Sequence, residues 1–309
     1  MNITLVLKNS DGTETEFDKI LSFAFRKDIY QPYTSLSVKT SAETFSPENI
    51  SEVKFFIDGR LIHHGLSDNI TFTKISGGAV VSVSSRGFTS MLIQNQIATG
   101  LKSNISINTL MDGFYSLPYV THEDNSKTSY IFVKSSSSMW DGIVNLSYKV
   151  CGTYPYIRGT NCVRMTAFEN PSAFAYQDSE IISRGISETG RKLVSHFHMS
   201  DIEGNFGEFE IEDNDVKSLN IVRHRFIELD RQFLYNPQQA LEYRSAYASR
   251  GRKRIFCTYS GYRGEDLYDT ADFGSVSGER IGAVIISGNG SGVVTEISVY
   301  RDKFLSDGI

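Results

Sequence analysis

The sequence predicts a mainly β protein with a small α+β middle domain, and three observations support this. Tyr and Phe are abundant, at 16 and 20 residues, whereas only six of the 309 residues are Pro. Apolar and polar residues alternate in many short segments separated by Gly, Asn, Asp and Ser, a pattern typical of strands and turns. Helical spacing is confined to a few stretches. A chain of this length is expected to form two or three domains.

Residues 1–98 predict one closed or nearly closed antiparallel barrel. Residues 3–7 alternate, Asn9 to Gly12 turn the chain, and residues 13–17 return as the second strand of a hairpin. Further strands are expected over residues 20–25 and 35–39. Closure into a barrel would remove the exposed strand edges that invite aggregation.

The stretch from Val53 to Ala98 is the most regular part of the chain. Residues 53–57 alternate, Asp58-Gly59 is suited to a tight hairpin turn, and residues 61–64 return, with Gly65 expected to break the strand. His63 and His64 are expected to point to opposite faces at an ordinary strand end. Two more strands are expected on either side of a turn at residues 76–78, followed by a short helix capped by Thr89 or Ser90.

Residues 99–172 mix helices and short strands. We expect a short helix over residues 107–115, a strand over residues 130–133, and a helix capped by Ser138 and stopped by Gly152. A hairpin follows, over residues 154–167. Trp140 shares helical spacing with aliphatic residues, which favours a core anchor over the alternative of a sugar-stacking residue.

Residues 173–309 return to strands. Asn236 as cap and Pro237 at the first helical position predict one helix, which Gly251 ends. Strands are expected over residues 193–199, 206–212, 218–225, 255–259, 282–287 and 293–300.

Four short pieces occur in a specific order in the most regular stretch. They are Ile57-Asp58-Gly59, His64-Gly65, Asp68-Asn69-Ile70 and Ser85-Arg86-Gly87-Phe88. Their order and spacing resemble the first domain of bacteriophage baseplate hub proteins, a group that includes the phage late control protein D family and the hubs of contractile injection systems. The helix before Gly152 and the Gly-x-Tyr-x-Tyr-Ile at residues 152–157 are similar to the middle domain of that family.

This resemblance implies two tail-tube-like antiparallel β-barrels, residues 1–98 and residues 173–309, that flank a small α+β domain, residues 99–172. It implies a virion structural protein that forms a homotrimer, a pseudo-six-fold ring joining the tail tube to the central spike. Its partners would be the tail spike protein, the tail tube and other baseplate proteins, with transient passage of DNA and no specific DNA binding. A phage or prophage origin implies synthesis in the bacterial host cytoplasm before assembly into the tail baseplate.

Composition excludes several classes of protein. The net charge of −5 argues against a protein that mainly grips nucleic acid. The sequence begins without the basic and apolar regions of a signal peptide, and it has no membrane-spanning segment by length of apolar run. Cys151, Cys162 and Cys257 are odd in number and read as free thiols.

Glu208, Glu210 and Glu212 alternate with apolar residues, so one strand face is expected to carry three carboxylates. A glycosidase pair and a calcium loop at residues 213–215 are alternatives, but the loop lacks the required Gly and closing Glu. The pattern favours a solvated face. In a ring-shaped hub that face would line the lumen, where like charge would keep DNA from sticking.

Two clusters are candidate ligand sites. His196 and His198 point to the same side of a strand, which would suit a metal ion if a third ligand such as His224 converged, but a half-exposed strand face is favoured. Four cations follow the last helix: Arg250, Arg252, Lys253 and Arg254. They could meet phosphate, but the negative end of the helix dipole is their ordinary place.

The sequence contains no complete nucleophile, metal or paired-carboxylate signature, which predicts a protein without catalytic activity and without a cofactor. Two other functions are kept as alternatives to the hub. One is a β-rich tail-tip protein that binds carbohydrate or processes cell-wall polysaccharide. The other is a distal-tail ring protein, which would form a hexamer.

Overall fold

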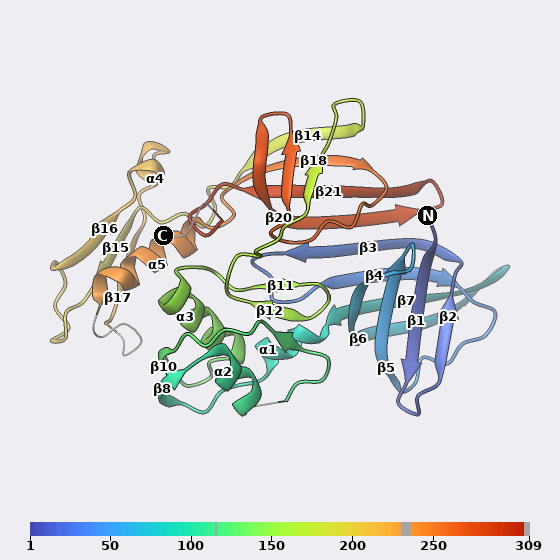
Figure 1. Ribbon diagram of the computed structural model, residues 1–309, viewed down its shortest axis with the longest axis horizontal. Coiled ribbons are helices and arrows are strands. Elements are labelled where there is room, and N and C mark those ends of the chain that lie inside the picture. The colour runs from blue at the N-terminus through green and yellow to red at the C-terminus, as the bar shows by residue number, and fades with distance from the viewer. Residues whose placement is uncertain (115, 230–235, 306–309) are drawn as a thin grey trace.

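One large sheet, almost all of it antiparallel, dominates the computed structural model, which describes residues 1–114, 116–229 and 236–305 (Figure 1). The expected mainly β fold is confirmed. The sheet has 13 strands, and its main path runs β14-β18-β21-β20-β3-β4-β7-β6-β5-β1-β2. A compact group of helices lies below the sheet in Figure 1, and a small separate sheet lies at the end farthest from the N-terminus.

The first seven strands follow the expected hairpins. They are β1 Ile3–Asn9, β2 Glu14–Phe17, β3 Ile20–Asp28, β4 Ser35–Ser41, β5 Ile50–Ile57, β6 Arg60–Ile75 and β7 Gly78–Gly87. Asp58 and Gly59 both have positive φ, 48° and 75°, as the tight turn between β5 and β6 requires. These strands form a rolled sheet, because apolar side chains of β1 and β5 share one core with those of β3, β4 and β7.

Gly65 does not end its strand, contrary to expectation. β6 is continuous through it, and Gly65 is where the strand changes partner, facing Val53 of β5 on one side and Gly87 of β7 on the other. A Cβ atom at this position would lie 2.1 Å from the carbonyl oxygen of Arg86. The glycine therefore permits close backbone approach within a long bent strand.

The middle region contains the expected helices. Its elements are the 3-10 turn Phe88–Ser90, α1 Met91–Gln94, β8 Gly100–Ile105, α2 Ile107–Phe114, β9 Thr121–His122, β10 Ser129–Val133, α3 Met139–Cys151, β11 Tyr156–Arg158 and β12 Cys162–Arg164. Ser138 and Asp141 form a reciprocal capping box on α3, and Gly152 ends it with a φ of 68°. Tyr115, at the end of the expected first helix, lies outside the described residues.

A small three-stranded sheet forms the far end of the molecule, the wing. It consists of β15 His196–Met199, β16 Phe209–Glu212 and β17 His224–Ile227, with α4 Asn214–Ser218 and α5 Pro237–Ser249. Asn236 caps α5 and Pro237 opens it, as expected. The strand expected over residues 218–225 is wrong, since Ser218 ends a helix and β17 begins only at His224.

The remaining strands complete the large sheet. They are β13 Ala173–Ala175, β14 Ile181–Glu188, β18 Lys253–Ser260, β19 Thr270–Phe273, β20 Val276–Asn289 and β21 Gly292–Tyr300. β20 pairs with β3 from Ala283–Asp28 to Asn289–Ser22, and this pairing joins the two ends of the chain into one sheet (Figure 1).

The order of strands repeats along the sheet. The first repeat consists of β3, β4, β6 and β7, and the second repeat of β14, β18, β20 and β21. In each repeat the strands, numbered in chain order, lie side by side as 1-2-4-3: β3-β4-β7-β6 and β14-β18-β21-β20. Both run in the same direction along the sheet, so the third strand of the second repeat meets the first strand of the first repeat.

Two large apolar cores stabilise this arrangement. One lies under the large sheet and includes residues of both repeats, among them Phe25, Val83, Cys257 and Ile297. The other joins α2 and α3 to the wing, with Trp140, Phe197 and Leu241 in one cluster. The division of the chain at residues 98 and 172 stays a prediction.

Candidate assembly surfaces and polar centres

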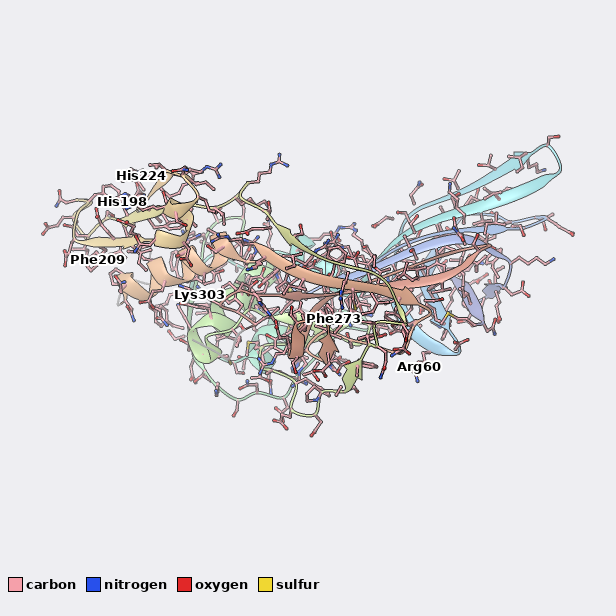
Figure 2. The ribbon with its side chains drawn as sticks, turned by 90° about the horizontal axis from the view of Figure 1, so that it is seen from above. Arg60, His198, Phe209, His224, Phe273 and Lys303 are labelled. Carbon is pink, nitrogen blue, oxygen red and sulfur yellow. The ribbon has the colours of Figure 1, made fainter. Side chains whose placement is uncertain are left out.

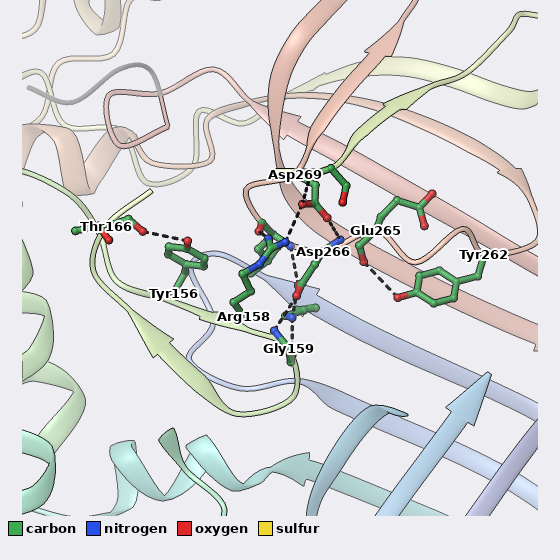
Figure 3. A network of polar contacts seen from close by, with 11 residues as sticks. Tyr156, Arg158, Gly159, Thr166, Tyr262, Glu265, Asp266 and Asp269 are labelled. Atoms are coloured by element: carbon green, nitrogen blue, oxygen red, sulfur yellow. Dashed lines mark hydrogen bonds and ion pairs between the residues drawn. The ribbon is translucent and has the colours of Figure 1, made fainter. Parts of the chain in front are cut away.

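A network of ion pairs around the buried Lys27 connects the two repeats with the middle region, and Figure 3 shows Arg158, Asp266 and Asp269 of this network. The ammonium group of Lys27 on β3 donates to the carbonyl oxygen of Gly159 at 2.6 Å and pairs with Asp266. Burial lowers the pKa of Lys27, against the opposing attraction of Asp266. Beside it, the guanidinium of Arg158 pairs with Asp269 at 2.8 Å. Three segments far apart in sequence are thus fixed by ion pairs at one point.

His63 is fully buried and is not the ordinary strand end that was expected. Its two ring nitrogens lie 2.8 Å from Thr34 Oγ1 and 2.7 Å from Ser85 Oγ. Ser85 donates its own proton to the carbonyl oxygen of Leu66, so its oxygen accepts from Nε2–H of His63, and Thr34 donates to Nδ1. Burial, aided by the neighbouring His64, lowers the pKa of His63 to about 3. The ring is therefore neutral at physiological pH.

His64 belongs to a second polar group, centred on the carboxylate of Glu52. His64 Nε2, Lys8 Nζ and Tyr119 Oη lie 2.9, 2.6 and 2.8 Å from the Glu52 oxygens. Burial by itself would raise the pKa of Glu52, but these hydrogen bonds outweigh it and lower the pKa to about 2. No local sequence pattern indicates either group, because the partners come from segments far apart in the chain.

The predicted acidic face lies on the wing. Glu210 and Glu212 belong to β16 and Glu208 precedes it, and all three are exposed. Glu210 accepts from His198 at 2.8 Å, and Glu212 pairs with Lys217. The face is therefore a mixed surface of carboxylates and imidazoles, since β15 places His198 and His196 directly opposite Glu210 and Glu212.

The structure brings together His196, His198 and His224 on the wing, and Figure 2 shows His198 and His224. His198 Nδ1 faces Glu210, so its Nε2 accepts the N–H of His224 Nδ1 at 2.9 Å. The ring of His196 stacks on that of His224 with centroids 4.1 Å apart. This contact between His198 and His224 is a hydrogen bond, and in residues 1–114, 116–229 and 236–305 no group of three His, Cys, Asp or Glu side chains is arranged to hold a metal ion.

Asp213 and three of the four cations considered above have structural partners. Asp213, considered for a calcium loop, is the N-cap of α4 and accepts from the amide of Val216 at 3.0 Å. Arg250 lies over the ring of Tyr247 and donates to its carbonyl oxygen at the end of α5, as the helix-end interpretation requires. Arg252 pairs with Glu188 and Arg254 with Glu296, at 2.8 and 3.0 Å.

Trp140 lies in the core between α3 and the wing, with 6% of its surface exposed. Its indole ring packs edge-on against Tyr154. The core interpretation is confirmed, and no indole face remains for stacking on a sugar. No helix in the described part of the chain has the length and apolar character needed to cross a bilayer.

Comparison with known proteins gives matches by structure alone. No protein-family model and no curated protein sequence matches this chain. A tail protein from Neisseria meningitidis MC58 superposes with a TM-score of 0.75 at 12% identity, covering 99% of this chain and 98% of that one. The 43 kDa tail protein of prophage MuSo2 from Shewanella oneidensis gives 0.68 at 14% identity, covering 96% and 97%.

A third similar structure comes from a secretion machine. It is an Escherichia coli component of the type VI secretion system that is itself similar in structure to the bacteriophage T4 tail proteins gp27 and gp5. It superposes with a TM-score of 0.56 at 10% identity, covering 93% of this chain and 77% of that one. Over nearly its whole length, the chain has the fold of these two tail proteins and of the secretion-system component.

Proposed function

We propose that this protein is the baseplate hub subunit of a phage tail or of a related contractile machine. Three copies would form a pseudo-six-fold ring that joins the six-fold tail tube to the three-fold central spike. The observation that carries this proposal is the tandem strand order of the large sheet, which gives each chain two equivalent units side by side. Three chains then supply six such units, the number that a six-fold tube requires.

The ring proposal is tested by measuring stoichiometry. Native mass spectrometry and light scattering across a range of concentrations, with and without the partner spike protein, should give a trimer. A closed ring uses heterologous contacts, and a stable one buries on the order of 1,000 Å² or more per contact. A hexamer would favour the distal-tail ring protein instead, and a two-fold symmetric dimer would contradict both.

The role is structural in this proposal, without catalysis or a cofactor. The alternative function, a tail-tip protein acting on polysaccharide, is less well supported, because the ring of Trp140 is buried and cannot stack on a sugar. Purified protein incubated with peptidoglycan and common polysaccharides should release no soluble fragment. Reproducible cleavage that disappears in Glu208→Gln or Glu210→Gln variants would reverse the assignment.

Glu208, Glu210 and Glu212 would face the lumen of the ring. The test variant replaces all three with Lys. The substitution at the exposed Glu208 should contribute little to the change in the free energy of unfolding. Those at Glu210 and Glu212 should contribute more, because they lose their partners His198 and Lys217. Particles assembled with this variant should release DNA poorly, because phosphates would be attracted to the channel. A structure of the ring with these residues on its outer rim would exclude a lumenal role.

A further inference from the structure

The two repeats agree in detail as well as in strand order. Between the first two strands of each repeat, the register shifts after the first pair: between Ile20 and Ser22 in the first repeat, and between Ile181 and Ser183 in the second. The third and fourth strands also shift at corresponding places, at Asp68 and at Gly282. Each of these residues stands seven positions before the end of its strand at the hairpin turn.

The pairing between the inner strands confirms this correspondence. Val38 on β4 faces Val83 on β7, and at the corresponding positions Cys257 on β18 faces Ile297 on β21. All three registers therefore align one repeat on the other residue by residue. Phe25 on β3 corresponds to Ile186 on β14, and Ile286 on β20 corresponds to Phe72 on β6.

One junction between repeats is already present within the chain. Each of its two strands has an equivalent strand in the other repeat, and that equivalent strand has an unpaired edge. Within the chain, β20 pairs with β3, third strand to first strand. The counterpart of β20 is β6, which pairs with β5 only up to Gly65 and with β7 beyond it. The counterpart of β3 is β14, which pairs only with β18. In the described residues, one edge of β6 from residue 66 to 75 and the outer edge of β14 thus remain unpaired.

We propose that β14 of one copy pairs antiparallel with residues 66–75 of β6 in the next copy, reproducing between chains the junction that β3 and β20 form within one. This inference rests on the ring assembly of the proposed function and names its interface. Transferring the known register places Ile186 opposite Phe72, as Phe25 lies opposite Ile286, and Ser187 opposite Thr71, as Arg26 lies opposite Ile285.

The exposure of β14 supports a missing neighbour. Ile186 is 65% exposed, whereas Phe25, its counterpart in the junction already formed, is 4% exposed. A groove of about 310 Å³ beside β14 is lined by Ile186, Ile255 and Phe273, and Phe72 of a neighbouring copy would enter it. Burying apolar surface at such an edge stabilises association and removes an aggregation-prone strand edge.

The other partner strand is presented for contact. The β6–β7 hairpin, cyan in Figure 2, projects from the body at the end opposite the wing. Ile75 near its tip is exposed. The transferred register also sets Lys74 opposite Arg184, which places two like charges side by side. The carboxylate of Asp178, which already pairs with Arg184 at 2.6 Å, offsets this repulsion.

Cysteine cross-linking tests both the contact and its register. Directly opposed residues of an antiparallel pair have Cα atoms about 4.5–5.5 Å apart, within the range that a disulfide spans. Thr71 and Ser187 are both exposed, so a Thr71→Cys/Ser187→Cys variant should fold and, on mild oxidation at high concentration, form covalent multimers. Each single variant should remain at the wild-type background set by the native cysteines.

The mismatched variant Thr71→Cys/Ser183→Cys is the matched control, because its second cysteine lies about 13 Å along the strand from the predicted partner. It should not cross-link. Equal cross-linking of the control or of the single variants would overturn the proposed register. A separate variant, Ile186→Asp, should weaken assembly at least tenfold without changing the unfolding midpoint, since its side chain is exposed in the isolated chain.

The outcomes separate this inference from the proposed function. A trimer that forms without the Thr71–Ser187 cross-link would overturn the strand pairing and leave the hub assignment standing. Cross-linked rings that close at a number other than three would confirm the pairing and contradict the trimer. Failure to cross-link and to assemble, with the spike protein present, would contradict both.

Discussion

At the residue scale, hydrophobic periodicity did not predict the buried polar side chains in the first half of the sheet. His63 occupies a position that alternation assigns correctly to a strand, yet its ring is buried and neutral between Thr34 and Ser85. Such a group links stability to pH. Because the folded state binds a proton only near pH 3 while an unfolded histidine binds one near 6.5, stability falls as the pH drops through that window.

We therefore predict that His63→Gln flattens the pH dependence of stability. Relative to its value at pH 8, the wild-type free energy of unfolding should lose about 2 kcal/mol at pH 5 through this residue. The variant should be less stable at pH 8 but should lack that loss. Urea unfolding from pH 8 to pH 5 measures it. His224, whose pKa is also lowered, contributes equally to the pH dependence of both proteins. Parallel plots of the free energy of unfolding against pH for the wild type and the variant would therefore contradict a buried, neutral His63.

A second prediction at this scale concerns Gly65. Gly65→Ala should destabilise the protein by roughly 1–3 kcal/mol, because the new methyl group would meet the carbonyl oxygen of Arg86 and force the two strands apart. Gly78→Ala, at the start of the neighbouring strand, is the matched control: its Cβ meets no atom within 4 Å. Chemical denaturation of both variants gives the comparison, and equal stability would show that β6 relaxes at no cost.

At the scale of elements, helices were predicted better than strands because their ends have local chemical signals. The ends of α3 and α5 lie where their local signals predict, at Ser138 and Gly152 for α3 and at Asn236 and Pro237 for the start of α5. β14 was not predicted, since its residues IISRGISE lack alternation: both of its faces are largely exposed in the isolated chain. Its place in the sheet is determined by pairing with β18, which lies more than sixty residues further along the chain.

The capping box of α3 gives a prediction at this scale. Ser138→Ala should cost about 1 kcal/mol, because the amide of Asp141 loses its acceptor and the Asp141 carboxylate loses a donor. Ser135→Ala in the preceding turn, at an exposed position, should change the free energy of unfolding by less than about 0.5 kcal/mol. Thermal and urea unfolding followed by far-UV circular dichroism would measure the difference, and an equal cost for the two would argue against the cap.

At the scale of the whole molecule, the Lys27 network joins the first repeat, the middle region and the second repeat. Lys27→Met should cost about 3–5 kcal/mol, since the Asp266 carboxylate loses its buried partner. Lys39→Met on the exposed face of β4 is the control for loss of a lysine charge. The double variant Lys27→Met/Asp266→Asn should cost less than the sum of the single variants, and strict additivity in urea unfolding would contradict the coupling.

The sequence by itself determined the mainly β class, most strands and turns, and the two long capped helices α3 and α5, because alternation, turn residues and caps act over a few neighbouring positions. It also predicted that Glu210 and Glu212 share one side of a strand, whereas Glu208, expected on the same face, precedes β16. Only the tertiary structure decided that His224 meets His198, that Lys27 meets Asp266, and that β20 pairs with β3. These contacts join residues far apart in the chain, and sheet pairing and burial fix them through the fold as a whole, which no local pattern encodes.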